Sequence, residues 1–372
     1  MKFSSERTKL LSELQLVTRA ASTRSAIPAL GGVLLTTADG SLSLAATDTE
    51  MALTSKTEAD VDQPGTVLLP ARLLLDVVRV ADGDTIVVET AADGSGVSIT
   101  SERASFTVRT LPAQDFPRLP ALDPEQTATL DAGVIAATVE RVAKAASRDE
   151  TRPVLTGILV SIENGTLRMV ATDSYRLSVK EAPVAGLDDD EFTANVPARA
   201  LQELGRIIGD TKVDSVSMST RENQIVFGAG GVTLSSRLID GQFPNYRQLL
   251  PESYEHDVMV GRSEFLSVVR RVSLMAQRNA PLRLRFEQGA VTLSAQTPDV
   301  GEASESLPVN YQGDELEIGF NPQFLQDGLE SVSTDEVRLR LISALRPGLI
   351  EEAGSEQADG FLYLIMPVRL NV

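Results

Sequence analysis

Cysteine and tryptophan are absent from this 372-residue chain, and histidine occurs once, as His256. The lack of cysteine excludes disulfides, thiolate metal sites and cysteine nucleophiles. A single histidine all but excludes a histidine-dependent catalytic triad and a histidine-rich metal site. Aromatic residues make up only 4% of the chain, which is few for the exposed ring platforms of a carbohydrate-binding protein. We therefore expect no metal and no cofactor.

Long apolar runs are missing as well. No stretch approaches the ~20 apolar residues of a transmembrane helix, and residues 1–6 contain no apolar core of a secretory signal. The glycine-rich segment 228–231 lacks the Lys-Ser/Thr of a nucleotide-binding loop and predicts a turn at a strand end. These absences favour a cytoplasmic protein that does not bind a membrane.

The chain does contain one pattern that occurs three times, at a spacing of about 125 residues. Ala46-Thr47-Asp48 returns as Ala171-Thr172-Asp173, and Leu69-Pro70-Ala71-Arg72 returns as Val196-Pro197-Ala198-Arg199 and more faintly as Phe320-Asn321-Pro322. A period of this length matches a whole domain, not a solenoid repeat. It predicts three similar domains over residues 1–122, 123–251 and 252–372.

Each third of the chain follows the same order of helices and strands. First helices are expected at about 6–21, 132–147 and 263–278, and second helices, opened by a proline, at about 71–80, 198–208 and 322–332. Asp39-Gly40 and Asn164-Gly165 suit the type I′ turn of a β-hairpin, and Gln288-Gly289 stands at the same place in the third copy. Two helices among many short strands indicate α+β domains, with antiparallel sheets whose helices lie on one face.

The net charge of −18 argues against phosphate binding if it is spread evenly. The six expected helices, however, sum to about +5, so the rest of the chain carries about −23. A face lined by helices would attract phosphates while the remaining surface repels them. The alternative is that the helices simply carry solvated lysine and arginine.

Several motifs, in this order and at both termini, resemble the bacterial DNA polymerase III beta subunit, the replication sliding clamp. They are Met1-Lys2-Phe3, Thr47-Asp48-Thr49-Glu50-Met51, Asp115-Phe116-Pro117, Ala171-Thr172-Asp173-Ser174-Tyr175-Arg176-Leu177, Phe243-Pro244-Asn245-Tyr246-Arg247 and Met366-Pro367-Val368-Arg369-Leu370. The resemblance implies three clamp domains per chain and a ring made of two chains joined head to tail. Helices would line the hole and antiparallel sheets would lie outside.

The resemblance also implies a function without chemistry. The ring would encircle double-stranded DNA without reading its sequence and would tether the replicative DNA polymerase, which confers processivity. Further expected partners are the clamp loader, other proteins that carry a clamp-binding motif and a second copy of the chain. Weak phosphate contacts suit a ring that must slide.

The motif positions also imply particular site residues. A peptide-binding pocket would be formed by Leu155, Thr172, Ser174, Tyr175, Arg176, Leu177, Pro244, Leu249, Asn321, Phe324, Leu345, Ile365, Met366, Pro367 and Val368. DNA contacts are expected at Arg24, Arg148, Arg152 and Arg199, and the dimer seam at Arg72, Arg103, Phe106, Leu274, Glu302 and Glu305. This sequence departs from the family at the pocket rim. The family often has a basic residue at the position of Gln248 and an aromatic residue at the position of Asn279.

Two other classes of function remain open at this point. Asp48, Glu50 and Asp173 could be imagined as the paired carboxylates of a hydrolase, although an aspartate that recurs in each repeat more often fixes a turn. A non-catalytic adhesion or carbohydrate-binding protein could also be built from repeats. It would need a secretory signal and exposed aromatic residues, which this sequence lacks.

Overall fold

The computed structural model describes residues 1–92, 94–123, 127–184, 192–277, 280–353 and 360–370. The chain forms two compact units, Met1–Gly133 with Glu203–Leu238, and Val134–Gln202 with Ile239–Val372. The second of the three sequence repeats therefore contributes to both units. The two compact units do not coincide with the three predicted domains. The domain boundaries at 122 and 251 refer to the sequence repeats and stay a prediction.

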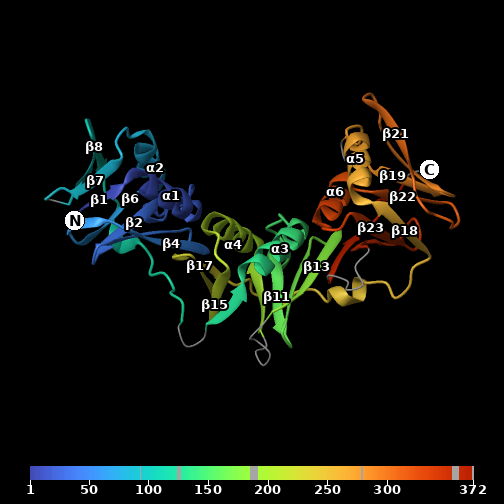
Figure 1. The fold of residues 1–372 in the computed structure, drawn as a ribbon, viewed down its shortest axis with the longest axis horizontal. Coiled ribbons are helices and arrows are strands. Elements are labelled where there is room, and N and C mark those ends of the chain that lie inside the picture. Colours follow the sequence, from blue (N-terminus) through green and yellow to red (C-terminus); the bar gives the residue numbers. More distant parts are fainter. Residues whose placement is uncertain (93, 124–126, 185–191, 278–279, 354–359, 371–372) are drawn as a thin grey trace. The chain divides into compact units, whose positions relative to one another are not determined.

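The first unit contains a five-stranded and an eight-stranded antiparallel sheet (Figure 1). The five-stranded sheet has the order β5-β1-β7-β8-β9, formed by Asp60–Gln63, Lys2–Glu6, Thr85–Thr90, Gly96–Ser101 and Ala104–Arg109. The eight-stranded sheet has the order β10-β15-β16-β17-β4-β3-β2-β6, formed by Ala128–Asp131, Ser215–Arg221, Gln224–Ala229, Val232–Arg237, Met51–Glu58, Ser41–Thr47, Gly32–Ala38 and Gly65–Pro70. The larger sheet combines strands of the first and second repeats.

The helices of the first unit begin where the sequence predicts them. Helix α1 is Arg7–Val17, extended by the 3-10 turn Thr18–Ala20, and α2 is Ala71–Val80. Helix α1 buries Leu10, Leu14 and Val17, which are three and four residues apart, and this spacing gives one apolar face. That face packs against β1 of the smaller sheet and β4 of the larger one. Short 3-10 turns follow at Pro28–Gly31 and Ala113–Asp115.

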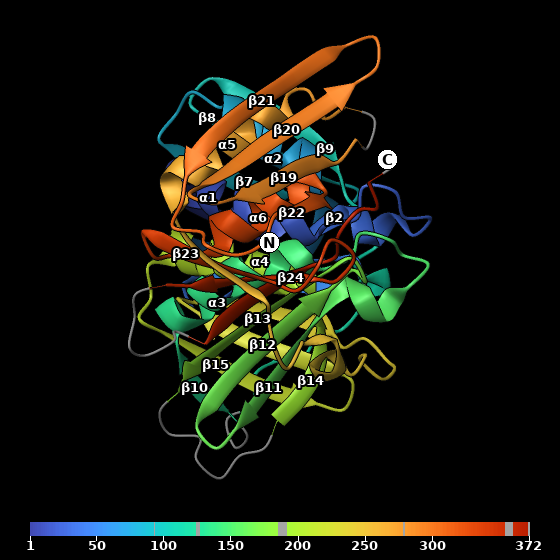
Figure 2. The same ribbon diagram turned by 90° about the vertical axis from the view of Figure 1, so that its right-hand side faces the viewer.

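The second unit repeats this plan with an eight-stranded and a four-stranded antiparallel sheet. The larger sheet has the order β14-β11-β12-β13-β25-β24-β23-β18, formed by Phe192–Pro197, Gly157–Glu163, Thr166–Thr172, Arg176–Pro183, Phe361–Ile365, Gly348–Glu352, Glu336–Leu341 and His256–Gly261. The smaller one has the order β21-β20-β19-β22, formed by Gly301–Pro308, Ala290–Thr297, Leu282–Glu287 and Leu316–Phe320. Figure 2 shows β13, β12, β11 and β14 side by side.

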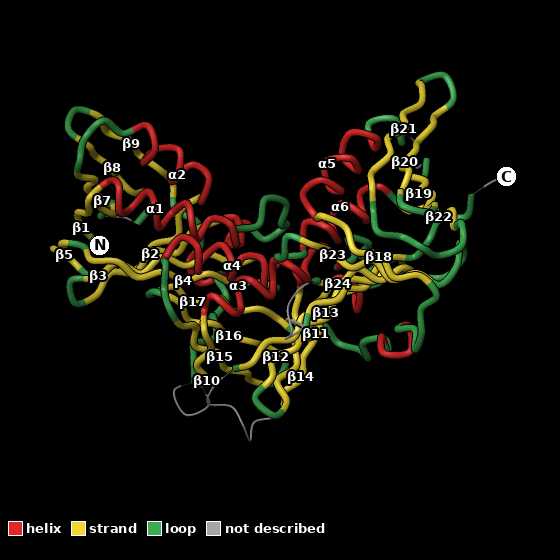
Figure 3. Tube along the Cα trace, turned by 45° about the vertical axis from the view of Figure 1, so that its right-hand side comes forward, coloured by secondary structure: helices red, strands yellow, loops and turns green. Residues whose placement is uncertain are grey.

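The helices of the second unit are α3 (Ala132–Val142, extended by Ala143–Ala145), α5 (Arg262–Ser273) and α6 (Pro322–Ser331), with 3-10 turns at Pro153–Thr156 and Tyr246–Leu249. Helix α4, Ala198–Thr211, runs from the second unit into the first. In Figure 3 the paired helices α5 and α6 lie against one face of the strands, as predicted for an α+β domain. The helix predicted over 263–278 ends at Ser273, because the amides of residues 274–276 bond three residues back.

Helix α6 docks closely on β25. Asn321 caps the helix, since its side-chain oxygen accepts hydrogen bonds from the amides of Gln323 at 2.9 Å and Phe324 at 3.2 Å. A Cβ on Gly328 would lie 2.6 Å from a ring carbon of Tyr363. Glycine at this helical position therefore lets Tyr363 approach the helix backbone.

Two of the three predicted hairpin turns have the expected type. Asp39 and Gly40 have φ values of 49° and 71°, and Asn164 and Gly165 have 50° and 68°. Both central residues of a type I′ turn need positive φ, so these two turns fit that type. In the third copy Gly289 alone has positive φ, at 80°, so Gln288-Gly289 forms a different turn between β19 and β20.

Strand pairing joins successive repeats in the same way at two joints. At the joint between the first and second repeats, β17 pairs with β4, and at the joint between the second and third, β25 pairs with β13. Strands β4, β13 and β21 are equivalent, because each follows the hairpin whose turn is described above and pairs with its second strand. Strands β17, β25 and β9 are equivalent closing strands. Only β9 and β21 of these six lie at sheet edges.

Ion pairs reinforce the second joint on its helical side. Glu330 of α6 bonds Lys144 of the α3 extension at 2.9 Å and Arg270 of α5 at 2.8 Å. These hydrogen bonds hold the pKa of Glu330 below its usual value. A depressed folded-state pKa stabilises the fold above the unfolded-state pKa of roughly 4.3, and this contribution disappears as pH falls through the folded value.

We expect Glu330→Gln to lower the melting temperature at pH 7 by roughly 2 °C, because two partly exposed ion pairs are lost. The deficit should shrink below about pH 4, where the native carboxylate becomes protonated. Thermal unfolding followed by circular dichroism from pH 3 to pH 8 measures this. Glu336→Gln is the control, since Glu336 is exposed and makes no ion pair within the described residues. An equal deficit at pH 3 and pH 7 would contradict the assignment.

Candidate functional site

The repeated Thr-Asp motif fixes a tight turn between two strands. Asp173 accepts hydrogen bonds from the amides of Tyr175 at 2.9 Å and Arg176 at 3.0 Å. In the first repeat Asp48 accepts from Glu50 and Met51 at 3.1 and 2.9 Å. The structure confirms the prediction that this aspartate fixes a turn, since in both copies its side-chain oxygen is occupied by backbone amides. A hydrolytic role for these carboxylates has no support in this geometry.

The second copy of the turn carries a buried cation that the first copy lacks. Arg176 follows Asp173, and its guanidinium bonds Asp173 at 3.0 Å and also Asp327 of α6. It also lies 4.3 Å from the centre of the Phe324 ring, within range of a cation–π contact. The Arg176 side chain is only 11% exposed, and the two carboxylates are each 14% exposed. This cluster links β13 of the second repeat with α6 of the third.

Tyr363 completes the cluster from β25. Its hydroxyl donates to the carbonyl of Phe324 at 3.0 Å and accepts from Arg176 at 3.4 Å. Burial raises the pKa of Tyr363 above its usual value, against the opposing effect of Arg176. Burial lowers the pKa of Arg176, but Tyr363, Asp327 and Asp173 outweigh it and hold that pKa above its usual value. Arg176 is therefore charged and Tyr363 neutral at physiological pH.

Four large apolar side chains are exposed around this cluster: Tyr175 at 63%, Leu249 at 48%, Leu345 at 61% and Met366 at 38%. We call them the exposed apolar surface. The amide of Met366 donates to the carbonyl of Tyr175 at 2.8 Å. Leu345 lies on the loop before β24, whose first residue pairs with the last residue of β25. The start of β13, the end of β25 and the start of β24 thus bring Tyr175, Met366 and Leu345 to one end of the sheet, while Leu249 lies on the 3-10 turn Tyr246–Leu249.

A buried cluster supports the exposed apolar surface from below. Leu177 pairs with Leu364 across β13 and β25, and both pack with Tyr246. Leu364 and Tyr246 were not among the predicted pocket residues. The alternation of Leu362, Tyr363 and Leu364 along β25 could have indicated that Leu364 shares the outer face with Leu177. Tyr246 lies in the quoted Phe-Pro-Asn-Tyr motif, which gave no sign that its ring would be buried.

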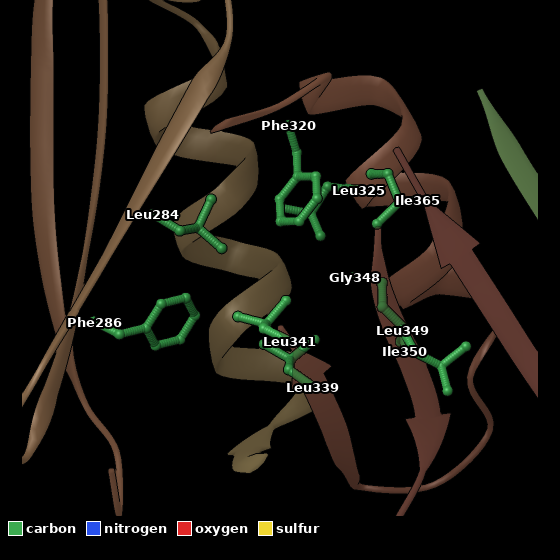
Figure 4. A pocket seen from close by; sticks show the side chains of 10 residues that line it. All are labelled: Leu284, Phe286, Phe320, Leu325, Leu339, Leu341, Gly348, Leu349, Ile350 and Ile365. Atoms are coloured by element: carbon green, nitrogen blue, oxygen red, sulfur yellow. The ribbon is translucent and has the colours of Figure 1, made fainter. Parts of the chain in front are cut away.

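Ile365, predicted in the pocket, does not reach the exposed apolar surface. Ile365 is 1% exposed and lines a small cavity of about 10 Å³ inside the third repeat (Figure 4). Phe320, Leu325 and Leu341 line the same cavity. Because successive side chains of a strand point to opposite faces, Ile365 points toward the helix side while Leu364 points to the outer face.

The remaining predicted pocket residues have varied surroundings. Leu155, in the turn Pro153–Thr156, and Thr172, at the end of β12, are buried. Ser174 and Pro244 are exposed, whereas Phe324, Pro367 and Val368 are partly buried. Thr172 and Asn321 hold the turn and the α6 cap through their side chains. Asn279, predicted at the rim, lies outside the described residues.

The predicted DNA-contacting arginines, Arg24, Arg148, Arg152 and Arg199, are all exposed. Arg148 and Arg152 flank Asp149, whose side chain accepts hydrogen bonds from the hydroxyl and amide of Thr151 at 2.7 and 3.0 Å. These bonds lower the pKa of Asp149. The loop between α3 and β11 therefore has a fixed carboxylate between its two arginines.

The helices and their 3-10 extensions carry twelve basic and eight acidic residues, a net charge of +4, close to the predicted +5. Many of these cations are already paired. Arg19 bonds Glu203 at 2.9 Å and Asp210 at 3.0 Å, and Arg271 bonds Glu305 at 2.6 Å. The helices are net basic, as predicted, but fewer of their charges are available to phosphates than a count implies.

The predicted seam residues lie on β9 and β21, each at one edge of its sheet, in the turn before β9, on α2 and just after α5. Phe106 is partly buried on edge strand β9, Arg103 is exposed on the turn before it, and the Arg72 side chain on α2 is 96% exposed. Glu302 and Glu305 lie on edge strand β21, and Leu274, just after α5, is 68% exposed. Glu305 differs from the expectation that it faces an arginine of another copy, because Arg271 of the same chain engages it.

No group of three or more His, Cys, Asp or Glu in the described part of the chain is arranged to hold a metal ion. None of the helices in these same ranges is long and apolar enough to cross a membrane.

Comparisons with known proteins cover the whole chain. Residues 1–120, 129–245 and 247–369 match the N-terminal, central and C-terminal domain models of the DNA polymerase III beta subunit. The chain is 35% identical to the beta sliding clamp of Streptomyces coelicolor, over all of both chains. It is 30% identical to the beta sliding clamp of Bacillus subtilis, over 99% of this chain and all of that one.

Solved structures agree with the sequence comparisons. The DNA polymerase sliding clamp of Bacillus subtilis superposes with a TM-score of 0.94 at 28% identity and covers all of both chains. The DNA polymerase III subunit beta of Pseudomonas aeruginosa superposes with a TM-score of 0.91 at 30% identity, over 99% of this chain and all of that one. With three repeated clamp domains and full-length relatives above 30% identity, this chain belongs to the DNA polymerase III beta subunit family, the beta sliding clamps.

Proposed function

We propose that two copies of this chain join head to tail into a ring that encircles duplex DNA and tethers the replicative polymerase. The observation that carries this proposal is that β9 and β21 both lie at sheet edges, unlike their equivalents in the other repeats. Each joint between repeats within the chain pairs a closing strand with the strand that follows a hairpin. Among the described residues, their equivalents β9 and β21 each have a neighbour on one side only. Pairing of β9 in one copy with β21 in another would form a joint equivalent to those within the chain. Two copies would form two such joints and so close the ring.

The repeats also supply a register for this joint. Counted from the hairpin turns, Thr54, Val179 and Ser304 are equivalent, as are Thr233, Leu362 and Ser105 on the closing strands. Thr233 pairs with Thr54, and Leu362 pairs with Val179. Ser105 should therefore lie opposite Ser304 of the other copy. The same register puts Phe106 opposite the small side chain of Ala303.

Helix ends support the same arrangement. Arg19, Lys144 and Leu274 each lie twelve residues after the first residue of α1, α3 or α5. Arg19 and Lys144 bond acidic residues on the second helix of the following repeat. For Leu274 the corresponding helix is α2 of another copy, where Leu73 is 49% and Val80 65% exposed. Apolar contact would replace the ion pair at this joint.

A ring of this kind needs no catalytic residue and no base readout. Exposed arginines such as Arg24 and Arg152 would make weak, sequence-independent phosphate contacts, which keep the DNA near the helices without stopping movement. The exposed apolar surface would accept short peptides of the polymerase, the clamp loader and other partner proteins. Methionine and aliphatic side chains can repack around different ligands, which suits a shared docking site.

The proposed register is tested with engineered disulfides. Because the chain has no cysteine, Ser105→Cys with Ser304→Cys introduces only the intended thiols. Oxidation should give a covalent dimer, since directly opposite residues lie within disulfide reach. The control pairs Ser105→Cys with Ser306→Cys, which is exposed on the same face two residues away. Non-reducing electrophoresis is the readout. Adding Phe106→Ala and Leu274→Ala should reduce the yield. Equal cross-linking of both cysteine pairs contradicts the register.

Retention on DNA should depend on topology. Clamps loaded onto nicked circular DNA should stay bound, and linearising the DNA should release them, because no tight phosphate contact holds the ring. Arg24→Ala with Arg152→Ala should weaken the residual direct binding, which should also decline with added salt. Gel filtration of loaded complexes before and after restriction cleavage measures retention. Persistent binding to linear DNA with free ends would argue against the ring.

Peptide docking is tested at Met366. Met366→Ala should weaken binding of a short peptide with a glutamine and apolar residues by about tenfold, because a few buried anchors dominate small interfaces. Met259→Ala is a matched control, since Met259 is also 38% exposed in the same unit. Fluorescence anisotropy of a labelled polymerase-derived peptide measures the affinity. If the two variants bind alike, the exposed apolar surface is not the docking site.

A further inference from the structure

The turn fixed by Asp48 in the first repeat and by Asp173 in the second is called the Asp turn here. Only the second of the two joints within the chain carries an arginine in this turn. The position of Arg176 in the second repeat is occupied by Met51 in the first. An acidic residue stands five residues into the second helix of every repeat, as Asp76, Glu203 and Asp327. At the first joint Glu203 pairs with Arg19, whereas at the second joint Asp327 pairs with Arg176. The second joint therefore has an additional ion pair beside the Asp turn, besides that of Lys144 with Glu330.

We propose that Arg176 is a positioning residue that assembles the exposed apolar surface from two repeats and does not itself contact the bound peptide. This inference rests on the proposed docking function and names how that site is held. Its guanidinium is engaged by four groups of the chain: Asp173, Asp327, Tyr363 and the ring of Phe324. With 11% of its side chain exposed, Arg176 has little surface left for a ligand.

Each contact of Arg176 fixes a different part of the site. Asp173 holds the turn that presents Tyr175. Asp327 and the cation–π contact hold α6 and Phe324 against that turn. Tyr363 lies three residues before Met366 on the same segment, and its hydroxyl bonds the carbonyl of Phe324. A planar guanidinium can bond two carboxylates and stack on a ring at once, which a lysine ammonium cannot do.

Direct contact and positioning predict opposite effects of Asp327→Asn. If Arg176 bonded the peptide, removing the Asp327 charge would free the guanidinium and leave peptide affinity unchanged or increase it. If Arg176 positions the site through Asp327, the same isosteric change should weaken peptide binding, by about tenfold. Because the two residues act as one unit, the double variant Arg176→Met with Asp327→Asn should bind little worse than either single variant.

Two further variants separate positioning from stability. Arg176→Lys keeps the buried positive charge, so melting temperature should stay near that of the native chain, yet peptide affinity should fall as in Arg176→Met. Glu330→Gln breaks ion pairs on the same helix without touching Arg176, and should leave peptide affinity unchanged. A purely structural role would instead make affinity follow melting temperature across all these variants.

The experiment is anisotropy titration of the labelled glutamine-containing peptide with the full chain, with melting temperature measured on the same samples. Weaker binding by Asp327→Asn, non-additive with Arg176→Met, supports the proposal. Unchanged or tighter binding by Asp327→Asn while Met366→Ala binds weakly overturns positioning and leaves the docking site standing. Full affinity in both Asp327→Asn and Met366→Ala overturns the docking site itself. If Arg176→Met does not fold, the Asp327→Asn and Arg176→Lys titrations still decide.

Discussion

Backbone pairing between repeats is the constraint on which the rest of this structure depends. Antiparallel ladders join β17 to β4 and β25 to β13, so each eight-stranded sheet belongs to two repeats at once. The same topology leaves β9 and β21 at sheet edges. Unpaired edges present rows of unused hydrogen-bonding groups and favour pairing with another chain. Pairing of β9 with β21 of a second copy would satisfy these groups through the same kind of antiparallel ladder that joins the repeats within the chain.

The helical side of each joint is less uniform than the sheet side. Ion pairs of Arg19 and Lys144 reinforce the two internal joints, whereas Leu274 at the equivalent place is exposed and apolar. Partly exposed ion pairs contribute little each, roughly 0.2–1 kcal/mol. They do fix which helix faces which, because an unpaired carboxylate such as buried Glu203 would be costly. Ion pairs thus determine which helices face each other within the chain. The exposed apolar side chain of Leu274 is available for contact with a second copy.

The exposed apolar surface arises at the second joint because three segments meet there. The Asp turn presents Tyr175, the end of β25 presents Met366, and the loop before β24 presents Leu345. At the first joint the equivalent turn buries Met51 and carries the charged Glu50, so no apolar surface is exposed by these two residues. The different residues in the two equivalent turns therefore distinguish the two joints.

The sequence by itself determined the repeat, the helix positions, two type I′ turns and the turn-fixing aspartates, because each depends on residues close together in the chain. Only the tertiary structure decided that Leu364, and not Ile365, faces the outer surface, and that Arg176 is engaged with Asp327. It also decided that Arg271 neutralises Glu305. Arg176 and Asp327 are 151 residues apart. Local periodicity fixes the spacing of side chains along an element, but it carries no information on which distant charge meets which when strands of different repeats pair.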